Sequence, residues 1–387
     1  SSCTDTGGGT KVVASIVGLD MGSTALRGVQ ISYGRTGAIG SVMRGASVEL
    51  PPDVMRNGVV MDAAAMKSAL KTLWRRGRFT TRKVAFALAD SGVLTRQVDL
   101  PWMEPTDFAT ALRYQIGDAL PVDVSSVELD YHLLDELRQT DEIGNPTVIN
   151  RILVVAANRD AVKAQAAILR SARLETVAAD SSAFALIRTA CAGRLPKDSA
   201  PRALADIGAD QLTFVIHQGG QPRFIRTIAN LGGNAATAAI ADRFDLDWAD
   251  AEQRKHDTGL NGPAPMVAPI AESSVFGSVD TLTADNPAAQ ATVEVLNPWA
   301  TNIISEIRNS IDYFQASQPG QALSSLDLTG LTMRIDGLEP RIATEIPLAI
   351  RTVQPFGGLP RASRMKIDDV EAAGFTVATG MALRGMP

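Results

Sequence analysis

The sequence is poor in the residues that hold small disulfide-bonded or metal-bound proteins together. Of its 387 residues, two are cysteines and three are histidines. Cys3 and Cys191 cannot form a disulfide framework, so a reducing compartment fits. His132, His217 and His256 lie far apart along the chain, without metal-ligand spacing. Metal chemistry through histidine or cysteine is therefore not expected.

An excess of positive charge and a long apolar run are also missing. The formal net charge of -5 argues against nucleic acid as a partner, because such binding calls for basic stripes. No apolar run approaches the ~18 residues that span a bilayer. Residues 1–11 have neither the basic region nor the apolar region of a signal peptide. We expect them to form a disordered leader. The length of 387 residues and the 45% share of hydrophobic residues predict sizeable cores, in two domains or in one domain with a large insertion.

Apolar residues at helical spacing predict several helices in the first half of the chain. Residues 61–79 show this spacing and carry basic residues toward the C-terminal end. Residues 104–121 predict a helix capped by Thr106. Asp180 occupies the expected N-cap position of a further helix over 181–192.

The second half contains a clear helical stripe after a segment without periodicity. The segment 262–297 is rich in Ala, Pro, Ser and Thr and predicts a mobile excursion. Asn297 is then expected as the N-cap of a helix whose first residue is Pro298. Residues 191–202 are polar and interrupted by Gly and Pro, so we predict the domain boundary there.

One short pattern occurs twice, close to half the chain apart. "LDMGSTALRGVQI" at 19–31 and "ADIGADQLTFVIH" at 205–217 both follow the order strand, Asp, any residue, Gly, small, polar, strand. Asp-x-Gly also occurs in ordinary turns, but two copies at this spacing favour two related halves. The chain contains neither G-x-x-x-x-G-K-[ST] nor a G-x-G-x-x-G after a strand.

The repeated turn suits the binding of phosphate. Its glycine lets successive amides point into one space, which forms an anion nest. Ser23 and Thr24 could add hydroxyl donors, and Thr213 could brace the second turn. A carboxylate beside such a nest would repel phosphate unless a cation lay between them. Asp20 and Asp206 therefore predict Mg²⁺ held mainly through waters.

These segments resemble the actin/Hsp70/sugar-kinase superfamily and, more closely, the PilM family of actin-like proteins in type IV pilus assembly, which is related to FtsA. The resemblance extends from Val12 to Arg384. Besides the two turns it includes, in order, "VLTRQVDLPWM", "LRYQIGDALPVDVSSVELDYHLL", "AEQRK", "EIRNSIDYF" and "AAGFTVATGMALR".

The resemblance implies an α/β, actin-like two-domain fold with an inserted subdomain of the FtsA/PilM type. The implied parts are a first domain at 12–198 with the insertion at about 86–155, a second domain at 199–370 with a peripheral subdomain at about 232–318, and a C-terminal helix within 371–387 that returns to the first domain.

The resemblance also implies a site for ATP and Mg²⁺ in the cleft between the domains, with the metal at Asp20 and Asp206. The implied cofactor-binding residues are Asp20, Gly22, Ser23 and Thr24 in the first phosphate loop, Asp206, Gly208, Ala209 and Thr213 in the second, Glu252 and Lys255 near the ribose and adenine, and Gly330 in the adenosine loop. That loop departs from the family pattern, because Leu331 and Thr332 stand where further glycines are usual.

The function implied is a cytoplasmic ATP-binding scaffold, held at the inner face of the cytoplasmic membrane by the N-terminal tail of a PilN-like protein. That tail would lie in a groove beside the inserted subdomain. Other pilus assembly proteins and a second copy of the chain are further expected partners, and ATP hydrolysis is expected to be slow at most. Two alternatives stay open. One is a nucleotide-free adaptor with a degenerate cleft, and the other is a small-molecule kinase with Asp180 as its base.

Overall fold

The computed structural model describes residues 14–35, 37–56, 58–88, 92–117, 120–140, 143–192, 200–261, 287–318, 320–363, 365, 367 and 369–385. The chain forms two compact units. The first contains the described residues of 1–199, 217–223 and 353–387, and the second contains those of 200–216 and 224–352. Each unit is described by itself.

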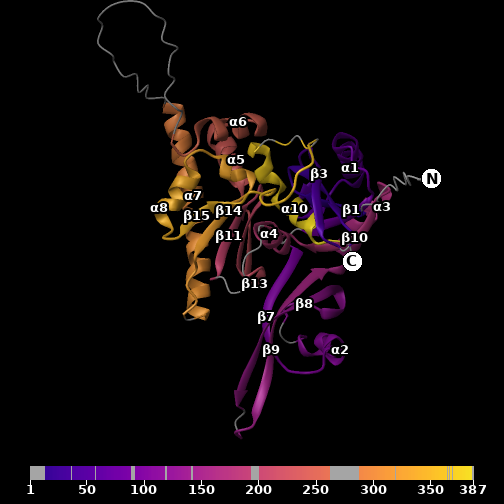
Figure 1. Cartoon of the computed structure of the whole chain (residues 1–387). Helices are drawn as coiled ribbons and strands as arrows, with labels where there is room; N and C mark the ends of the chain where they lie inside the picture. Colours follow the sequence, from indigo (N-terminus) through magenta and orange to yellow (C-terminus); the bar gives the residue numbers. More distant parts are fainter. Residues whose placement is uncertain are drawn as a thin grey trace, which may run out of the picture. The chain divides into compact units, whose positions relative to one another are not determined.

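The main sheet of the first unit has five strands in the order β10-β6-β1-β2-β3 (Figure 1). The strands are β1 (Ala14–Met21), β2 (Ala25–Tyr33), β3 (Ile39–Glu49), β6 (Lys83–Leu88) and β10 (Glu175–Ser181). The pairs β1–β2 and β2–β3 are antiparallel, whereas β1–β6 and β6–β10 are parallel. A two-stranded ribbon, β4 (Met55–Arg56) with β5 (Val59–Val60), follows β3.

Helices pack on both faces of this sheet because alternate residues of a strand point to opposite sides. The helices are α1 (Ala63–Gly77), α3 (Arg159–Ser171), α4 (Ser182–Ala190), α9 (Asp369–Ala372) and α10 (Thr376–Leu383). Leu19 of β1 shares a buried cluster with Leu70 and Leu73 of α1. Its neighbour Gly18 faces α10 instead.

Helix α10 lies in the core of the first unit, and Thr376–Ala382 are all buried. Two glycines allow this close packing. A Cβ at Gly380 would lie 1.8 Å from the carbonyl oxygen of Ala185 in α4. A Cβ at Gly18 would lie 2.0 Å from the carbonyl oxygen of Ala378. The helix is therefore held between β1 and α4 at distances that only glycine permits.

A second, three-stranded sheet is inserted between β6 and α3, in the order β7-β9-β8. Its elements are β7 (Val93–Pro101), α2 (Pro105–Gln115), β8 (Val127–Thr140) and β9 (Pro146–Asn158). Helix α2 covers one face of this sheet (Figure 1), where Phe108 and Leu112 pack with Ile152. The N-cap of α2 is Glu104, so the prediction of Thr106 as the cap is wrong.

The sheet of the second unit repeats the plan of the first, in the order β13-β12-β11-β14-β15. The strands are β11 (Arg202–Ile207), β12 (Gln211–Gln218), β13 (Gln221–Ala229), β14 (Ser325–Thr329) and β15 (Ala349–Thr352). β11 pairs in parallel with the later strand β14, as β1 does with β6. The helices are α5 (Gly233–Phe244), α6 (Trp248–Thr258), α7 (Pro287–Ser317) and α8 (Leu338–Glu345), and Leu331–Arg334 form the short 3₁₀ helix η3.

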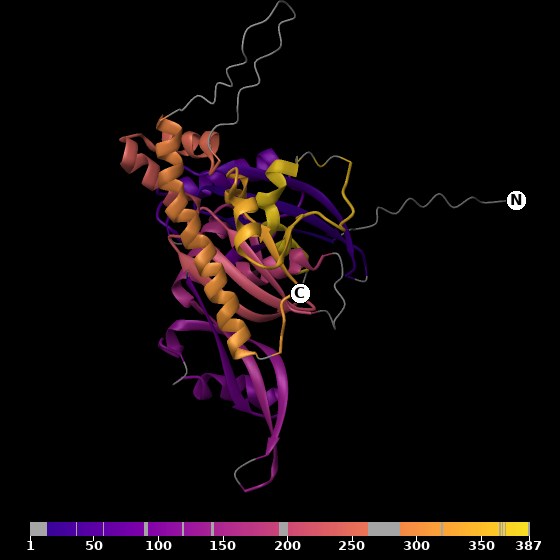
Figure 2. The ribbon, with the colours of Figure 1, turned by 90° about the vertical axis from the view of Figure 1, so that its left-hand side faces the viewer.

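The long helix α7 runs across the sheet of the second unit (Figure 2). It begins at Pro287, so the prediction that Asn297 caps it is wrong and Pro298 lies inside the helix. The buried stripe of α7 continues through Leu296 to Ala289, and the burial of these extra turns offsets the hydrogen bond that proline cannot make. The rest of the predicted excursion, 262–286, lies outside the described residues.

Candidate functional site

The duplicated sequence pattern forms the same turn in both units. In the first turn (residues 22–25), the N–H of Gly22 donates to the carbonyl of Ala25 at 3.1 Å. In the second turn (residues 208–211), the N–H of Gly208 donates to the carbonyl of Gln211 at 3.0 Å. A Cβ on either glycine would lie 3.1 or 3.2 Å from that same carbonyl. The turn is thus repeated in its hydrogen bonding as well as in its residues.

Each turn contains two successive backbone amides that donate no hydrogen bond within the described part of the protein. They belong to Ser23 and Thr24 in the first turn and to Ala209 and Asp210 in the second. All four residues are at least partly exposed. Paired amides with no internal acceptor form a nest for an anion, so both turns fit phosphate oxygens.

Asp20 is the last residue but one of β1, beside the first turn. Its carboxylate lies 3.7 Å from the guanidinium of Arg27, and its side chain is 19% exposed. Burial raises the pKa of Asp20 to about 6, and the nearby Arg27 offsets only part of this rise. A carboxylate whose loss of hydration is only partly offset by its arginine is a group that a bound divalent cation would stabilise. The oxygen chemistry of Asp20 therefore fits Mg²⁺.

The other predicted residues of the phosphate loops lie where the strands end. Asp206 is the last residue but one of β11. Thr213 is buried in β12, where its hydroxyl accepts a hydrogen bond from Gln211 at 3.4 Å. The two predicted metal residues, Asp20 and Asp206, belong to different units. No group of three or more His, Cys, Asp or Glu that could hold a metal occurs among the described residues.

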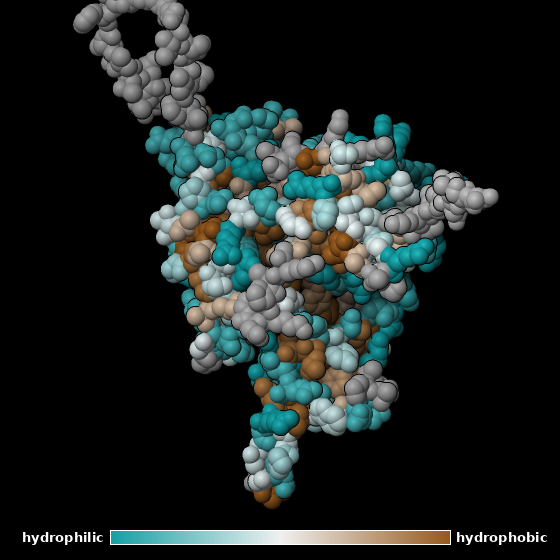
Figure 3. Space-filling view, in the orientation of Figure 1, coloured by the Kyte–Doolittle hydropathy of each residue, from teal (hydrophilic) through white to brown (hydrophobic). Residues whose placement is uncertain are grey.

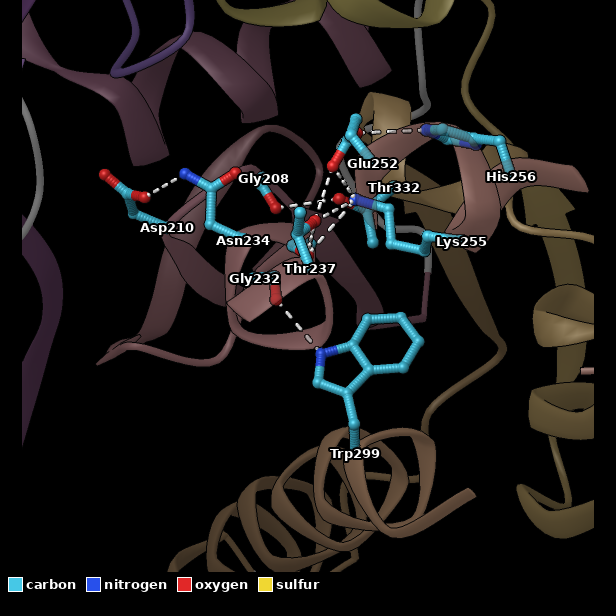
Figure 4. Close-up of polar contacts among 11 residues, drawn as sticks. Gly208, Asp210, Gly232, Asn234, Thr237, Glu252, Lys255, His256, Trp299 and Thr332 are labelled. Carbon is cyan, nitrogen blue, oxygen red and sulfur yellow. Dashed lines mark hydrogen bonds and ion pairs between the residues drawn. The ribbon is translucent and has the colours of Figure 1, made fainter. Parts of the chain in front are cut away.

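In the second unit, Lys255 of α6 is the centre of a buried network (Figure 4). Its ammonium donates to Glu252 at 2.6 Å, to the hydroxyl of Thr237 at 2.8 Å and to the carbonyl of Gly233 at 3.2 Å. An ammonium has three donors, so all of them are used. Glu252 also accepts hydrogen bonds from Thr237 and from His256, the latter at 3.2 Å.

Glu252 and Lys255 differ in what they can offer a ligand. Lys255 is 2% exposed, and burial lowers its pKa. The side chain of Glu252 is 39% exposed. Burial would raise the pKa of Glu252, but the hydrogen bonds from His256, Lys255 and Thr237 outweigh this effect and lower it to about 2. Glu252 is therefore a charged acceptor that solvent reaches, whereas Lys255 holds the network together.

The start of α5 supports the second turn. The backbone N–H groups of Gly233 and Asn234 donate to the carbonyls of Gly208 and Ala209, at 3.0 and 2.7 Å. The side-chain amide of Asn234 donates to Asp210 at 2.6 Å (Figure 4). These bonds hold the second turn against the start of α5. The sequence signal for this support is the glycine pair that opens the helix, although it was not predicted as part of the site.

The loop after β14 also contacts the second turn. Gly330 has φ +100°, and a Cβ there would lie 2.3 Å from the carbonyl oxygen of Ile207. The hydroxyl of the buried Thr332 donates to the carbonyl of Gly208 at 2.8 Å. Leu331 is half-buried in η3. The non-glycine residues of this loop are thus packed within the protein, and Thr332 occupies space near the start of α5.

Two further residues of this region were not predicted. Thr237 binds both members of the Glu252–Lys255 pair. The indole N–H of Trp299 in α7 donates to the carbonyl of Gly232 at 3.0 Å and anchors the glycine pair (Figure 4). Their roles depend on contacts between helices far apart in the sequence, so no local pattern indicated them.

A cavity of about 270 Å³ lies within the first unit, beside the inserted sheet. We call it the α4 cavity. Its lining residues are Asp130, Tyr131, His132, Val155, Asp180, Phe184, Ile187, Arg188, Gly220, Gln221, Pro222 and Arg384. The lining combines aromatic and aliphatic side chains with charged groups of both signs.

Asp180 lies in the wall of the α4 cavity between two cations. Its carboxylate is 2.9 Å from Arg188 and 3.2 Å from Arg384. It does not cap the helix that follows, because the side chain of Ser181 accepts the hydrogen bond from the N–H of Ala183. The predicted capping role of Asp180 is therefore wrong. Asp180 is thus paired with both guanidiniums, and Asp130 is a second carboxylate in the lining.

Comparisons with known proteins agree with this architecture. Residues 18–266 and 283–386 match the family described as type IV pilus assembly protein PilM. A solved structure of a PilM–PilN type IV pilus biogenesis complex has a TM-score of 0.77 at 24% identity, over 95% of this chain and 98% of the other. No helix among the described residues is both long and apolar enough to cross a membrane.

More distant structures share the fold. The ethanolamine utilization protein EutJ of Carboxydothermus hydrogenoformans has a TM-score of 0.52 at 13% identity, over 96% of this chain and 89% of that one. MreB5 of Spiroplasma citri with AMPPNP has a TM-score of 0.50 at 11% identity, over 95% and 94%. The expected actin-like two-domain α/β fold is confirmed. The match over most of its length shows that this chain belongs to the PilM family of type IV pilus assembly proteins.

Proposed function

We propose that this protein is a scaffold of type IV pilus assembly that binds ATP with Mg²⁺ and the N-terminal tail of a PilN-like inner-membrane protein. The observation that carries the nucleotide part is the repeated turn, with two unpartnered amides in each unit. Membership of the PilM family supports the assembly role. The similarity to a PilM–PilN complex supports the choice of partner and a location at the inner face of the cytoplasmic membrane.

The two turns would bind the phosphates of ATP. The four unpartnered amides would donate to phosphate oxygens, and the hydroxyls of Ser23 and Thr24 would add donors to the first turn. Asp20 and Asp206 would hold the magnesium ion through waters. The ion would supply the positive charge that lets carboxylates and phosphates share one site. Three observations support this assignment: the free amides of the two turns, the raised pKa of Asp20 and the partial exposure of its side chain.

The nucleoside would bind at the second unit. Glu252 is charged at neutral pH and partly exposed, so it can accept hydrogen bonds from ribose hydroxyls. Gly330 would lie near the adenosine, and its missing side chain lets this loop pack against the carbonyl of Ile207. Lys255 would hold Glu252 in place rather than contact the ligand. Hydrolysis would be slow, because Asp20 and Asp206 are assigned to the metal and the turns and no other residue is assigned to orient a water.

The tail of the partner would lie in the α4 cavity. A short extended peptide can place apolar side chains against Phe184, Ile187 and Val155. Its backbone carbonyls can accept hydrogen bonds from the arginines that surround Asp180. The position of the cavity beside the inserted sheet supports this assignment.

Calorimetric titration of the full chain with Mg-ATP, and separately with a peptide of the partner tail, tests both parts. We expect Asp20→Ala and Asp206→Ala each to abolish ATP binding, while Asp53→Ala, an exposed aspartate outside the site, leaves it unchanged. We expect Arg384→Gln to weaken peptide binding about tenfold, the effect of losing one charge-assisted hydrogen bond. The exposed Arg361→Gln serves as its control. Unchanged binding in the aspartate variants would refute the nucleotide site.

A nucleotide-free adaptor is the second candidate, favoured by one observation. The side chains of Thr332 and Lys255 already fill the space beside Gly233, where they lie 2.7 and 3.5 Å from the position of an added Cβ. Space that the protein itself fills is not open to a nucleotide. Peptide binding without any ATP binding in the wild-type chain would select this alternative. The small-molecule kinase is disfavoured, because the carboxylate of its expected base, Asp180, is held by two arginines. ATP consumption stimulated by a small hydroxylated compound would restore it.

A further inference from the structure

Basic residues are concentrated in two segments of the first unit, although the chain as a whole is acidic. The net charge is -5, yet residues 63–83 contain seven lysines and arginines and no acidic residue. Residues 161–174 contain three basic residues and again no acidic one. The first segment includes α1 and the second includes most of α3. Neither segment contributes to the proposed ATP site or to the α4 cavity.

In α1 the basic residues form a stripe away from the core. Lys67, Lys71, Arg75 and Arg78 are spaced at i, i+4, i+8 and i+11, which places them along one side of the helix. The buried residues of α1, such as Leu70, lie on a different side. The last turn of a helix attracts basic residues through its dipole, but this effect does not account for residues one and two turns earlier.

Helix α3, which contacts α1, also carries basic residues. Lys163 and Arg170 are seven residues apart on one side of α3, and Arg173 follows the helix. The two helices pack beside each other. The guanidinium of Arg82, beyond the end of α1, donates to the carbonyl of Arg173 at 3.3 Å and joins the two segments.

Together these residues form one exposed surface, which we call the α1–α3 basic surface. Its exposed members are Lys71, Arg75, Arg76, Arg78, Arg82, Lys163, Arg170 and Arg173. None of them takes part in an ion pair with another described residue. In Figure 3, hydrophilic residues lie among residues of mixed hydropathy at the upper right, where α1 and α3 lie in Figure 1.

We propose that the α1–α3 basic surface binds the anionic headgroups of a phospholipid bilayer. Eight unneutralised cations spread over two helices and a turn suit a broad array of negative charges. The contact would be electrostatic rather than inserted, because the aromatic residues nearby are already packed. Trp74 and Phe79 meet edge to face at 5.3 Å, and the indole N–H of Trp74 donates to the carbonyl of Thr81.

The same packing disfavours a nucleic acid as the occupant, since surfaces for unpaired bases present free aromatic rings for stacking. The choice of a membrane rests on the proposed function, which places the protein beside an inner-membrane partner. The basic surface would then add a second, partner-independent contact, so that the tail and the lipid headgroups act together.

Flotation of the full chain with vesicles tests this proposal without any partner peptide. The vesicles contain equal parts of phosphatidylglycerol and phosphatidylcholine, or phosphatidylcholine alone. The test variant combines Lys71→Gln, Arg75→Gln and Arg78→Gln. The control variant combines Arg138→Gln, Arg334→Gln and Arg351→Gln, three exposed arginines outside this surface that change the net charge equally.

We expect the wild type to bind the anionic vesicles and to be released from them by salt. It should not bind the vesicles of phosphatidylcholine alone. The test variant should bind about 100-fold more weakly, since each basic residue strengthens binding roughly fivefold, and the control variant should bind like the wild type. Equal weakening in both variants, or equal binding to both kinds of vesicle, would overturn the proposal. Binding to a DNA duplex or an RNA but not to vesicles would overturn it as well.

The same proteins distinguish this inference from the proposed function. The test variant changes no residue of the α4 cavity, so it should bind the tail peptide as the wild type does. A wild-type chain that binds the tail peptide but not the anionic vesicles would count against the membrane surface alone. A wild-type chain that binds the vesicles but not the tail peptide would instead count against the proposed PilN-like partner. Thermal unfolding followed by circular dichroism shows that both variants are folded.

Discussion

A single hydroxyl illustrates how the core of the first unit depends on residues from distant parts of the chain. Tyr33, at the end of β2, is 4% exposed, and its hydroxyl donates to the carbonyl of Ala382 in α10. Burial raises the pKa of Tyr33 to about 12. The phenol must therefore stay protonated for α10 to pack on the sheet.

This pKa shift predicts a loss of stability at alkaline pH. The pKa of Tyr33 in the folded protein lies above the unfolded value of 10.0. Its contribution to the unfolding free energy is therefore complete below pH 10 and is lost as the pH rises toward 12. Tyr33→Phe should cost about 1 kcal/mol at pH 8 through the missing hydrogen bond. Between pH 10 and 12, the unfolding free energy of this variant should fall by about 2 kcal/mol less than that of the wild type. Urea unfolding at several pH values measures both effects.

The exposed Tyr114 provides the control, since Tyr114→Phe removes a phenol that contacts solvent. Its unfolding free energy should follow the wild type at every pH. Parallel curves for wild type and Tyr33→Phe would contradict the assigned role.

The residues of the site differ in how far the sequence could reveal them. Asp and Gly in a turn are local signals, so the two turns were predictable from their letters and their spacing. The burial of Lys255 depends on α6 packing beside α5, which no pattern within α6 specifies. The hydrogen bond from Thr332 to Gly208 likewise joins residues far apart in the sequence. Contacts of this kind are set by the tertiary structure.

Among the elements, α10 makes the closest contacts with its neighbours. The backbone of α4 approaches Gly380 on one side, and Gly18 of β1 approaches on the other. A helix that is buried all round needs such small residues, because it has no side that can move toward solvent.

We therefore predict that Gly380→Ala destabilises the first unit strongly. The added Cβ would lie 1.8 Å from the carbonyl oxygen of Ala185, and backbone atoms on both sides must move apart. We expect a loss of at least about 3 kcal/mol in unfolding free energy, measured by denaturant unfolding. Gly92→Ala is the matched control, since nothing lies within 4 Å of a Cβ there. Similar stability in the two variants would show that α10 tolerates a looser fit.

The first residues of helices were the least predictable feature of the elements. At α4 two neighbouring candidates, Asp180 and Ser181, could both cap, and the ion pairs of Asp180 decide in favour of Ser181. At α7, Pro298 is a strong local signal for a helix start. The buried stripe that continues toward Pro287 overrides it, because burial along about three extra turns outweighs one missing hydrogen bond.

For the whole molecule, the repeat seen in two short segments extends to the complete sheets. Both units place a meander of three strands beside two strands that come later in the chain. The sequence indicated this duplication because the turn that begins each meander kept its Asp and Gly. The strand order itself followed from the resemblance rather than from the residues, since pairing between distant strands leaves no local pattern.

The division into two units predicts a selective response to truncation. A chain without residues 376–387 should lose protection from hydrogen exchange in β1, β6 and α4, against which α10 packs. The strands β11 and β14 and helix α7 should keep theirs, since the core of the second unit contains no residue of α10. Mass spectrometry of proteolytic peptides measures both sets in one sample. Equal loss of protection in the two sets would show that the units unfold together.

The position of α10 has a consequence for synthesis on the ribosome. The first unit starts with β1, but its interior needs Thr376–Leu383, which are translated more than three hundred residues later. At about 5–20 residues per second, the nascent sheet waits at least ~15 s with the face around Gly18 uncovered. The second unit has its whole chain available earlier, so the unit that begins first is the last to be completed.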